Sequence, residues 1–237
     1  MGKIETAHHI LLQNPIRNYC AIRLLSLMEN PDIAIENRTV LITDKSTEGK
    51  FSVFVPSGPS GNKDIFAKIP TQPGELFIID DWPLEYILPN QQLSRDLDCY
   101  QLHLPDDVVL PEDDARICDI GIEHAAYIYT NYDSHEFTTQ DYIDRQIQSG
   151  PAIGIIENER LIAWAMTHEE GSMGFLTVLP EYRRQGLGAR LTTALSRRIR
   201  QADGIPTVHI VKTNQASLAM AKKNGFIHNA NVHWLLS

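Results

Sequence analysis

The chain has 237 residues, of which 43% are hydrophobic, 22% charged and 8% aromatic, a composition that excludes collagen-like, disordered and disulfide-scaffold proteins. The formal net charge of -9 argues against attraction of the whole chain to nucleic acid or anionic lipid. The charge is uneven, because residues 1–150 carry 11 basic and 24 acidic residues, whereas residues 151–237 carry 10 and 6. An anionic ligand is therefore expected in the C-terminal third.

The cysteines and histidines show no metal-binding or disulfide pattern. Cys20, Cys99 and Cys118 are widely spaced, without a CxxC motif or a Cys/His cluster. The nine histidines form no HExxH motif, so no metal is expected. No apolar run reaches the ~18 residues of a membrane span, and the first residues lack the apolar region of a secretory signal. We expect a cytoplasmic protein without nucleic-acid or membrane partners; no oligomeric state follows from the sequence.

The first half of the chain is predicted to be a small unit of helices and strands. Residues 4–30 are predicted to be helical, with an interruption at Pro15. Four β-type runs follow, at 38–44, 51–56, 76–80 and 97–104. The next segment is acidic and rich in proline, as surface connections are. The predicted organisation is an N-terminal domain at 1–104, a connection at 105–114 and a second domain at 115–237.

The second half alternates strands and helices. Strands are expected at 116–121, 152–159, 160–168, 173–180, 207–213 and 232–236. Helices are expected at 122–132, 138–149, 187–201 and 215–224. Thr138 or Thr139 is a suitable cap for the second of these helices. In the third, an apolar residue recurs every four positions and predicts one buried stripe, made of Leu187, Leu191, Leu195 and Ile199.

The strongest local motif is LTVLPEYRRQGLGARL at 176–191, which has the features of an anion site. A helix N-terminus presents backbone N–H groups without partners and a positive dipole end. Gly186 and Gly188 would let phosphate oxygens approach the backbone, and Arg183 and Arg184 add charge. On these residues alone, an ordinary turn followed by a solvated arginine face is an equally good interpretation.

Two other phosphate-binding motifs fit this segment poorly. The third glycine of a dinucleotide-binding GxGxxG loop is missing, and the next strand ends in Lys212-Thr213-Asn214 rather than in an acidic ribose ligand. No GKS or GKT follows the glycines, so a Walker A loop is absent.

The same residues carry a resemblance to a family. LTVLPEYRRQGLG, followed by a strand that reaches Asn214 and then by Ser217 and Asn224-Gly225-Phe226, resembles the acyl-CoA-binding core of the GNAT superfamily of acyltransferases, whose signature is R/Q-x-x-G-x-G/A. Further residues are similar to the glycine N-acyltransferase branch: His124-Ala125-Ala126, the run from Tyr142, Pro151, Trp164 and the closing VHW. The similarity covers about 115–237 well and the N-terminal half only loosely.

The resemblance implies a fold and a cofactor site. The fold is α/β (α+β), a GNAT-type mixed sheet flanked by helices, with two GNAT-like halves of which the N-terminal one is degenerate. The donor is acetyl-CoA or another acyl-CoA. The residues matched to its binding are Leu176, Thr177 and Val178 for the pantetheine arm, Arg183, Arg184, Gln185, Gly186, Leu187, Gly188 and Ala189 for the pyrophosphate, and Asn214 and Ser217 near the thiol.

The resemblance also implies an acyl transfer to an amine, which requires a base for the ammonium proton. His209 is the candidate base, because glycine N-acyltransferases carry a histidine at this position and imidazole titrates near neutral pH; a structural histidine is the equal alternative. Glycine N-acyltransferases have a glutamate where this chain has Ser172. Glu170 is a possible substitute, although a solvated hairpin turn is the more expected place for it.

The predicted function is N-acylation of a small-molecule primary amine such as an amino acid. Many GNAT members have a tyrosine that protonates the leaving thiolate at the position of Ala221; glycine N-acyltransferases also lack it. Tyr127, Tyr129, Tyr132 and the segment 133–137 are candidates for lining the acceptor site. The missing groups at Ser172 and Ala221 leave open a non-catalytic acyl-CoA-binding regulator, and His209 leaves open a peptide N-terminal acetyltransferase.

Overall fold

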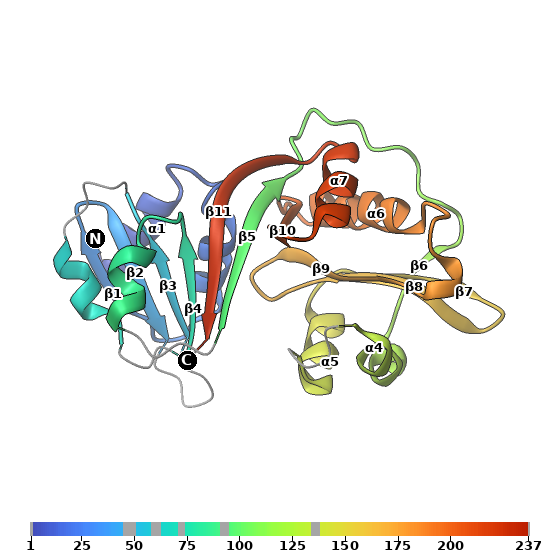
Figure 1. Ribbon diagram of the computed structural model, residues 1–237, viewed down its shortest axis with the longest axis horizontal. Coiled ribbons are helices and arrows are strands. Elements are labelled where there is room, and N and C mark those ends of the chain that lie inside the picture. The colour runs from blue at the N-terminus through green and yellow to red at the C-terminus, as the bar shows by residue number, and fades with distance from the viewer. Residues whose placement is uncertain are drawn as a thin grey trace. The chain divides into compact units, whose positions relative to one another are not determined.

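The chain divides into two compact units. A computed structural model describes residues 2–44, 51–57, 63–70, 74–90, 95–133 and 138–236 (Figure 1). The first unit comprises Met1–Gln101, Ile210–Asn214 and His228–Ser237. The second comprises Leu102–His209 and Gln215–Ile227. Neither unit is continuous in sequence. The predicted domain boundaries, by contrast, cut the chain into the consecutive segments 1–104, 105–114 and 115–237. These boundaries stay a prediction.

The first unit is a mixed sheet with helices on both faces. Its elements are α1 (Lys3–Leu11), α2 (Tyr19–Leu27), β1 (Asp32–Glu36), β2 (Thr39–Asp44), β3 (Phe51–Val55), the 3-10 turn η1 (Lys63–Lys68), β4 (Glu75–Ile79), α3 (Leu84–Ile87), the 3-10 turn η2 (Leu88–Asn90), and most of β5 (Arg95–His103) and β11 (Ile227–Leu236). The strand order is β1-β2-β3-β4-β11-β5. Strands β3 and β4 are parallel, and β1–β2, β2–β3 and β4–β11 are antiparallel.

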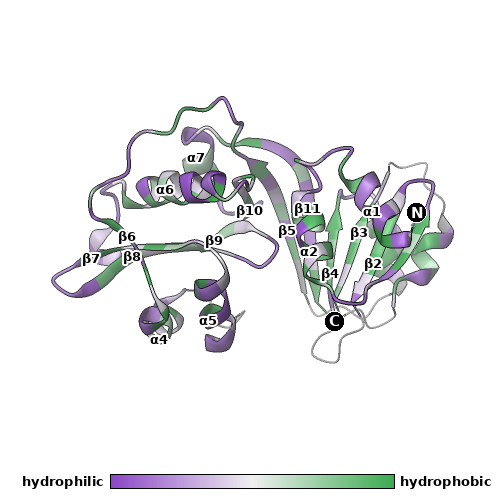
Figure 2. Cartoon of the chain, turned by 180° about the vertical axis from the view of Figure 1, so that it is seen from behind, coloured by the Kyte–Doolittle hydropathy of each residue, from purple (hydrophilic) through white to green (hydrophobic). Residues whose placement is uncertain are grey.

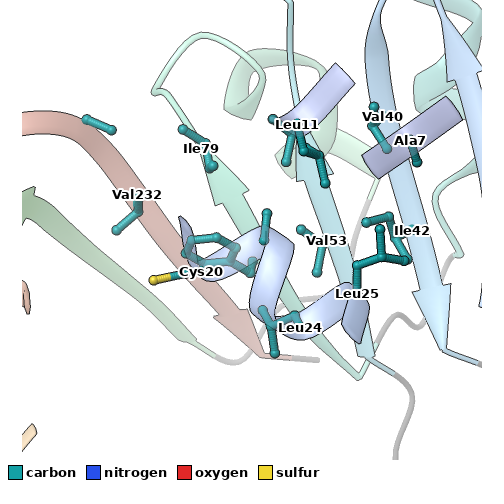
Figure 3. Close-up of a cluster of buried hydrophobic side chains, with 14 of the residues drawn as sticks. Ala7, Leu11, Cys20, Leu24, Leu25, Val40, Ile42, Val53, Ile79 and Val232 are labelled. Atoms are coloured by element: carbon teal, nitrogen blue, oxygen red, sulfur yellow. The ribbon is translucent and has the colours of Figure 1, made fainter. Parts of the chain in front are cut away.

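Both faces of this sheet are apolar, because neighbouring residues of a strand point to opposite sides. Val53 packs with Leu11 and Cys20 of the first two helices (Figure 3), whereas Phe54, the next residue, packs with Ile65 of η1. Strands β3 and β4 are accordingly hydrophobic along much of their length (Figure 2). The C-terminal strand adds Val232 to the first of these clusters.

The second unit is a mixed sheet between two helical layers. Its elements are β6 (Ile117–Asp119), the 3-10 turn η3 (Ile122–His124), α4 (Ala125–Asn131), α5 (Gln140–Ser149), β7 (Ala152–Glu157), β8 (Arg160–Thr167), β9 (Ser172–Val178), the 3-10 turn η5 (Pro180–Tyr182), α6 (Leu187–Gln201), most of β10 (Thr207–Val211) and α7 (Gln215–Lys223). The strand order is β10-β9-β8-β7-β6, antiparallel except for β9–β10. Helices α4 and α5 lie on one face, and α6 and α7 on the other (Figure 1).

The two halves of the chain present the same order of elements. Two helices precede three antiparallel strands, and a crossover then leads to a fourth strand parallel to the third, namely β1 to β4 in one half and β7 to β10 in the other. Each first hairpin turns through two residues of positive φ, Asn37-Arg38 and Asn158-Glu159, as a type I′ turn requires.

Most elements agree with the sequence prediction. Helix α6 has the predicted bounds, its four stripe residues are all buried, and Thr139 caps α5 by accepting a hydrogen bond from the Tyr142 N–H. Strand β1 and helix α3 were not predicted. Cys20, Cys99 and Cys118 form no disulfide bond within the described residues. Within the described residues, no helix has both the length and the hydropathy needed to cross a membrane.

Removal of a core side chain should distinguish packing from surface effects. Leu195 of α6 is fully buried, so Leu195→Ala should lower the free energy of unfolding by about 2–5 kcal/mol, through lost burial and a residual cavity. Val109 is 88% exposed, and Val109→Ala should change the free energy by less than about 0.5 kcal/mol. Urea unfolding measures both; equal midpoints would contradict the assigned core.

Candidate functional site

The loop between β9 and α6 presents unpaired backbone amides. Arg184 and Gly186 both have positive φ, 65° and 78°, and α6 begins directly after them. Gly186 is the N-cap and has no side chain to accept a hydrogen bond from the first turn. The amides at the start of α6 are therefore free to bind an anion at the positive end of the helix dipole.

A pocket of about 400 Å³ opens at this helix terminus. Seven of the residues predicted for cofactor binding line it: Val178, Arg183, Arg184, Gly186, Leu187, Gly188 and Ala189. Helix α7 contributes Ala219, Met220 and Lys223, which were not predicted. The sequence could not reveal these three residues, because only the packing of the folded chain brings α7 beside the start of α6.

Glycine is favoured at positions 186 and 188 for different physical reasons. A Cβ at Gly186 would meet nothing within 4 Å, so its positive φ is what favours glycine there. At Gly188 a Cβ would lie 3.3 Å from the sulfur of Met220. Gly188 therefore allows close approach of α7, and the expectation that both glycines make room for a phosphate stays a prediction.

Few of the nearby arginines are available to a ligand. Four on α6 bind the acidic connection or strand β6: Arg190 pairs with Asp114, Arg197 with Asp113, Arg198 with Asp113 and with Asp119 of β6, and Arg200 donates to the carbonyls of Pro105 and Val108. Arg183 donates to the Val178 carbonyl at 2.9 Å and pairs with Asp133 at 3.2 Å. Arg184 is exposed and has no hydrogen-bond or ion-pair partner among the described residues. The free positive charge at the pocket is therefore that of Arg184 and Lys223.

Strands β9 and β10 separate after Met173, and β9 then runs on to the pocket at Val178. Their parallel ladder, as far as the two strands are described, consists of Ser172–Thr207 and Met173–Val208. Strand β9 continues for five more residues to Val178, so its edge from Gly174 onward is not paired with β10. Leu176, Thr177 and Val178, the predicted pantetheine contacts, lie along this edge. An extended polar chain can pair with such an edge as an added strand does.

Two histidines lie beside the point of separation. His209 follows the last paired residue of β10, on the same strand face as Thr207, and it lies near His168. A Cβ on Gly174 would overlap Nε2 and Cδ2 of His168, so the His168 imidazole occupies the space above this glycine. The Tyr142 hydroxyl lies 3.2 Å from His168 Nδ1. Sequence reasoning missed His168, which belongs to no motif, and it assigned no role in the site to Tyr142, which it used only for the resemblance.

Both histidines are held in the neutral form. Burial, and secondarily the proximity of His168, lowers the pKa of His209 from 6.5 to about 3. Burial also lowers the pKa of His168 to about 4, with a small opposing effect of Glu169. The expectation that His209 titrates near neutral pH is therefore wrong for the ligand-free site, because desolvation disfavours the imidazolium.

Glu170 is buried, contrary to the expectation of a solvated turn. It does lie in the β8–β9 turn, where Gly171 donates to the His168 carbonyl. However, Glu170 is only 4% exposed, and its carboxylate accepts a hydrogen bond from the hydroxyl of Ser172, which is 1% exposed. The chain thus places a buried carboxylate beside the position where glycine N-acyltransferases are expected to carry their glutamate.

An aromatic cluster surrounds a bulge in β9. The pairing with β8 slips by one residue, and Phe175 takes a positive φ of 53° there. Its ring centroid lies 4.9 Å from that of Tyr132 and 4.7 Å from that of His168. Tyr127 instead packs on Trp164 and accepts a hydrogen bond from Arg160. Residues 134–137 of the candidate segment lie outside the described residues.

The remaining predicted residues are divided between the units. Gln185 is exposed and is not part of the pocket lining, and Thr177 is buried and donates to the Phe175 carbonyl. Ser217 lies on α7 in the second unit, whereas Asn214 belongs to the first unit.

One group in the first unit brings ligand-type atoms together. Atoms of Asp81, Asp98 and His233 lie within 4.8 Å of one another. The Lys212 ammonium lies 2.6 Å from Asp98 and 3.4 Å from Asp81, so this lysine already supplies a cation to the cluster. Burial by itself would raise the pKa of Asp81, but hydrogen bonds from His233 and Asn231 together with the nearby Lys212 lower it.

The two half-buried histidines predict a pH dependence of stability. Between pH 6.5 and about 4 the unfolded chain binds protons at positions 168 and 209 while the folded chain does not, so stability should fall as the pH falls. The double variant His168→Gln/His209→Gln should show a smaller fall in urea midpoint from pH 7 to pH 5. His8→Gln, at an exposed position, should follow the wild type. An unchanged slope in the double variant would contradict the neutral assignment.

Comparisons with known proteins agree on the fold. The family model of FR47-like proteins matches residues 152–235. A Drosophila protein of solved structure is 18% identical with a TM-score of 0.77, over 100% of this chain and 97% of the other. A GCN5-related N-acetyltransferase-like protein from Streptococcus suis is 12% identical with a TM-score of 0.59, over 99% and 98%. A GCN5-related N-acetyltransferase from Kribbella flavida is 16% identical with a TM-score of 0.56, over 93% and 95%.

No curated protein matches the sequence. The agreement of structure neighbours over nearly the whole chain nevertheless shows the architecture, a mixed sheet flanked by helices. The chain has the fold of the GNAT acetyltransferases and contains an FR47-like domain at residues 152–235.

Proposed function

We propose that the chain transfers an acyl group, acetyl or another small acyl, from acyl-CoA to a primary amine of a small molecule such as an amino acid. The observation that carries the proposal is the continuity between three features of the second unit. These are the pocket at the start of α6, the unpaired edge of β9, and the histidine-lined face at Gly174. A long donor with an anionic end and a reactive end could occupy these three features in order.

The donor would extend from the pocket at the start of α6 along the edge of β9 to Gly174. The amides at the start of α6, together with Arg184, suit the pyrophosphate, because they supply donors and charge without a competing partner. The edge of β9 from Val178 to Gly174 spans roughly 13 Å at the rise of an extended strand and suits the amide-containing arm. The thioester would then lie beside Gly174 and His209.

The reaction needs no group beyond the two substrates and a proton acceptor. The amine nitrogen attacks the thioester carbonyl carbon, forming the C–N bond while the C=O pair moves to oxygen. The oxyanion collapses, the C–S bond breaks, and CoA leaves as the thiolate. The ammonium proton passes to a ring nitrogen of neutral His209 and from there, through water, to the thiolate. The products are the amide and CoA.

The choice of acceptor rests on the sequence. The resemblance to glycine N-acyltransferases supports a small amino acid, and the buried Glu170 offers a carboxylate beside Ser172, the position that matches the glutamate of that branch. A peptide N-terminal acetyltransferase is the alternative that His209 supports. The low pKa of His209 supports another alternative, a regulator that binds acyl-CoA without turnover, because a weakly basic imidazole is a poor proton acceptor.

Thiol release tests the proposal directly. Wild-type protein with acetyl-CoA should release free thiol on addition of amino acids, and the rate should exceed that with peptides. Gly186→Glu places bulk and negative charge at the proposed pyrophosphate site and should abolish acetyl-CoA binding. Gly186→Asn, which tolerates positive φ and adds no charge, should keep binding within about tenfold. Binding by a folded Gly186→Glu variant with wild-type affinity would remove the site assignment.

Replacement of the candidate base should separate binding from chemistry. His209→Ala should lower kcat by about 10²–10⁴-fold, with the dissociation constant of acetyl-CoA within about threefold of wild type. The loss should be largest at low pH, where the free amine is scarce. Steady-state kinetics and calorimetric titration measure the two quantities. A wild-type kcat in this variant would place the proton acceptor elsewhere.

A further inference from the structure

We propose that His168 stabilises the transition state of the transfer, by donating a hydrogen bond from Nε2–H to the carbonyl oxygen of the thioester, and that Tyr142 fixes the tautomer that makes this possible. The inference deepens the proposed function and rests on it. It assigns roles to His168, Tyr142 and Gly174, none of which belongs to the sequence motif.

The His168 imidazole lies over the end of the β9 edge that the donor would follow. Gly174 is the first residue of β9 beyond the ladder with β10, so it marks the end of the edge along which the donor arm would lie. The atoms of His168 that a Cβ on Gly174 would overlap are Nε2 and Cδ2. The ring therefore stands over the strand with Nε2 close to the point at which the thioester would arrive.

The backbone and the ring of His168 are both held in place by neighbouring groups. The His168 N–H donates to the Ser172 carbonyl at 2.8 Å, and its own carbonyl accepts from Gly171 at 2.9 Å. The ring packs on Phe175 with a centroid distance of 4.7 Å. A side chain held from backbone and ring together keeps its geometry during a reaction, which is what makes a donor effective.

The contact with Tyr142 supplies the tautomer. The Tyr142 oxygen accepts from the Glu169 N–H at 3.4 Å and lies 3.2 Å from His168 Nδ1. In our assignment the phenol proton is donated to Nδ1, so that the single proton of the neutral imidazole is on Nε2. Desolvation of the half-buried ring lowers its pKa and favours the neutral form, so this proton is donated in a hydrogen bond and is not transferred.

The two histidines then have separate tasks. As the amine adds to the carbonyl carbon, negative charge develops on the oxygen, and the Nε2–H of His168 stabilises it until the C–S bond breaks. His209, on the neighbouring strand, accepts the proton that the new ammonium loses. A neutral donor and a neutral acceptor side by side avoid the repulsion that two imidazolium ions would have.

The substitution Gly174→Ala tests this geometry without touching a reacting group. The new Cβ must displace the His168 ring, so Gly174→Ala and His168→Ala should each lower kcat by about 10²–10³-fold, with acetyl-CoA affinity within about threefold of wild type. The double variant should be no slower than His168→Ala alone, because both changes remove the same interaction. Tyr142→Phe should lower kcat by about tenfold.

A readout that is independent of turnover completes the test. In [1-¹³C]acetyl-CoA bound to wild type without amine, the carbonyl resonance should move downfield, as expected for a hydrogen-bonded carbonyl. It should return toward its free position in His168→Ala and in Gly174→Ala. Two results would overturn the role of His168 and leave the acyltransfer proposal intact. One is a carbonyl resonance of bound acetyl-CoA that stays the same in both variants. The other is losses in kcat that multiply in the double variant. Failure of wild type to bind acetyl-CoA would overturn both.

Discussion

The short ladder between β9 and β10 is the constraint on which the site depends. Two residue pairs hold the strands together, after which β9 runs on to Val178 with an edge that β10 does not cover. Backbone N–H and C=O groups need partners, and a ligand that pairs with this edge supplies them. The pocket at α6 lies at one end of the edge and Gly174 at the other, so binding and chemistry are arranged along a single strand.

Charge is organised around this strand by the acidic connection before β6. A chain of net charge -9 would repel a polyanion unless its positive groups were concentrated and uncompensated. Asp113 and Asp114 of the connection, with Asp119 of β6, pair with Arg190, Arg197 and Arg198 of α6. Arg184, at the start of the helix, keeps its charge free. The connection thus acts as a local counterion, and the positive potential remains at the N-terminus of α6.

Local features were predictable from sequence, and features that depend on register were not. The bounds of α6 and the Thr139 cap follow from periodicity and capping, which are properties of short segments. The burial of Glu170 and the position of His168 over Gly174 depend on how β8 and β9 pair across a bulge. Likewise, the final strand pairs with β4 in the first unit, a long-range choice that its apolar sequence leaves open.

The most direct test is a crystal structure of the chain with a non-hydrolysable acyl-CoA analogue. The account predicts the pyrophosphate on the amides at the start of α6, with the pantetheine arm paired to the edge of β9. It places the acyl carbonyl within hydrogen-bonding distance of His168 Nε2 and next to His209. A donor bound outside this pocket, or an arm that does not follow β9, would contradict the assignment of the site.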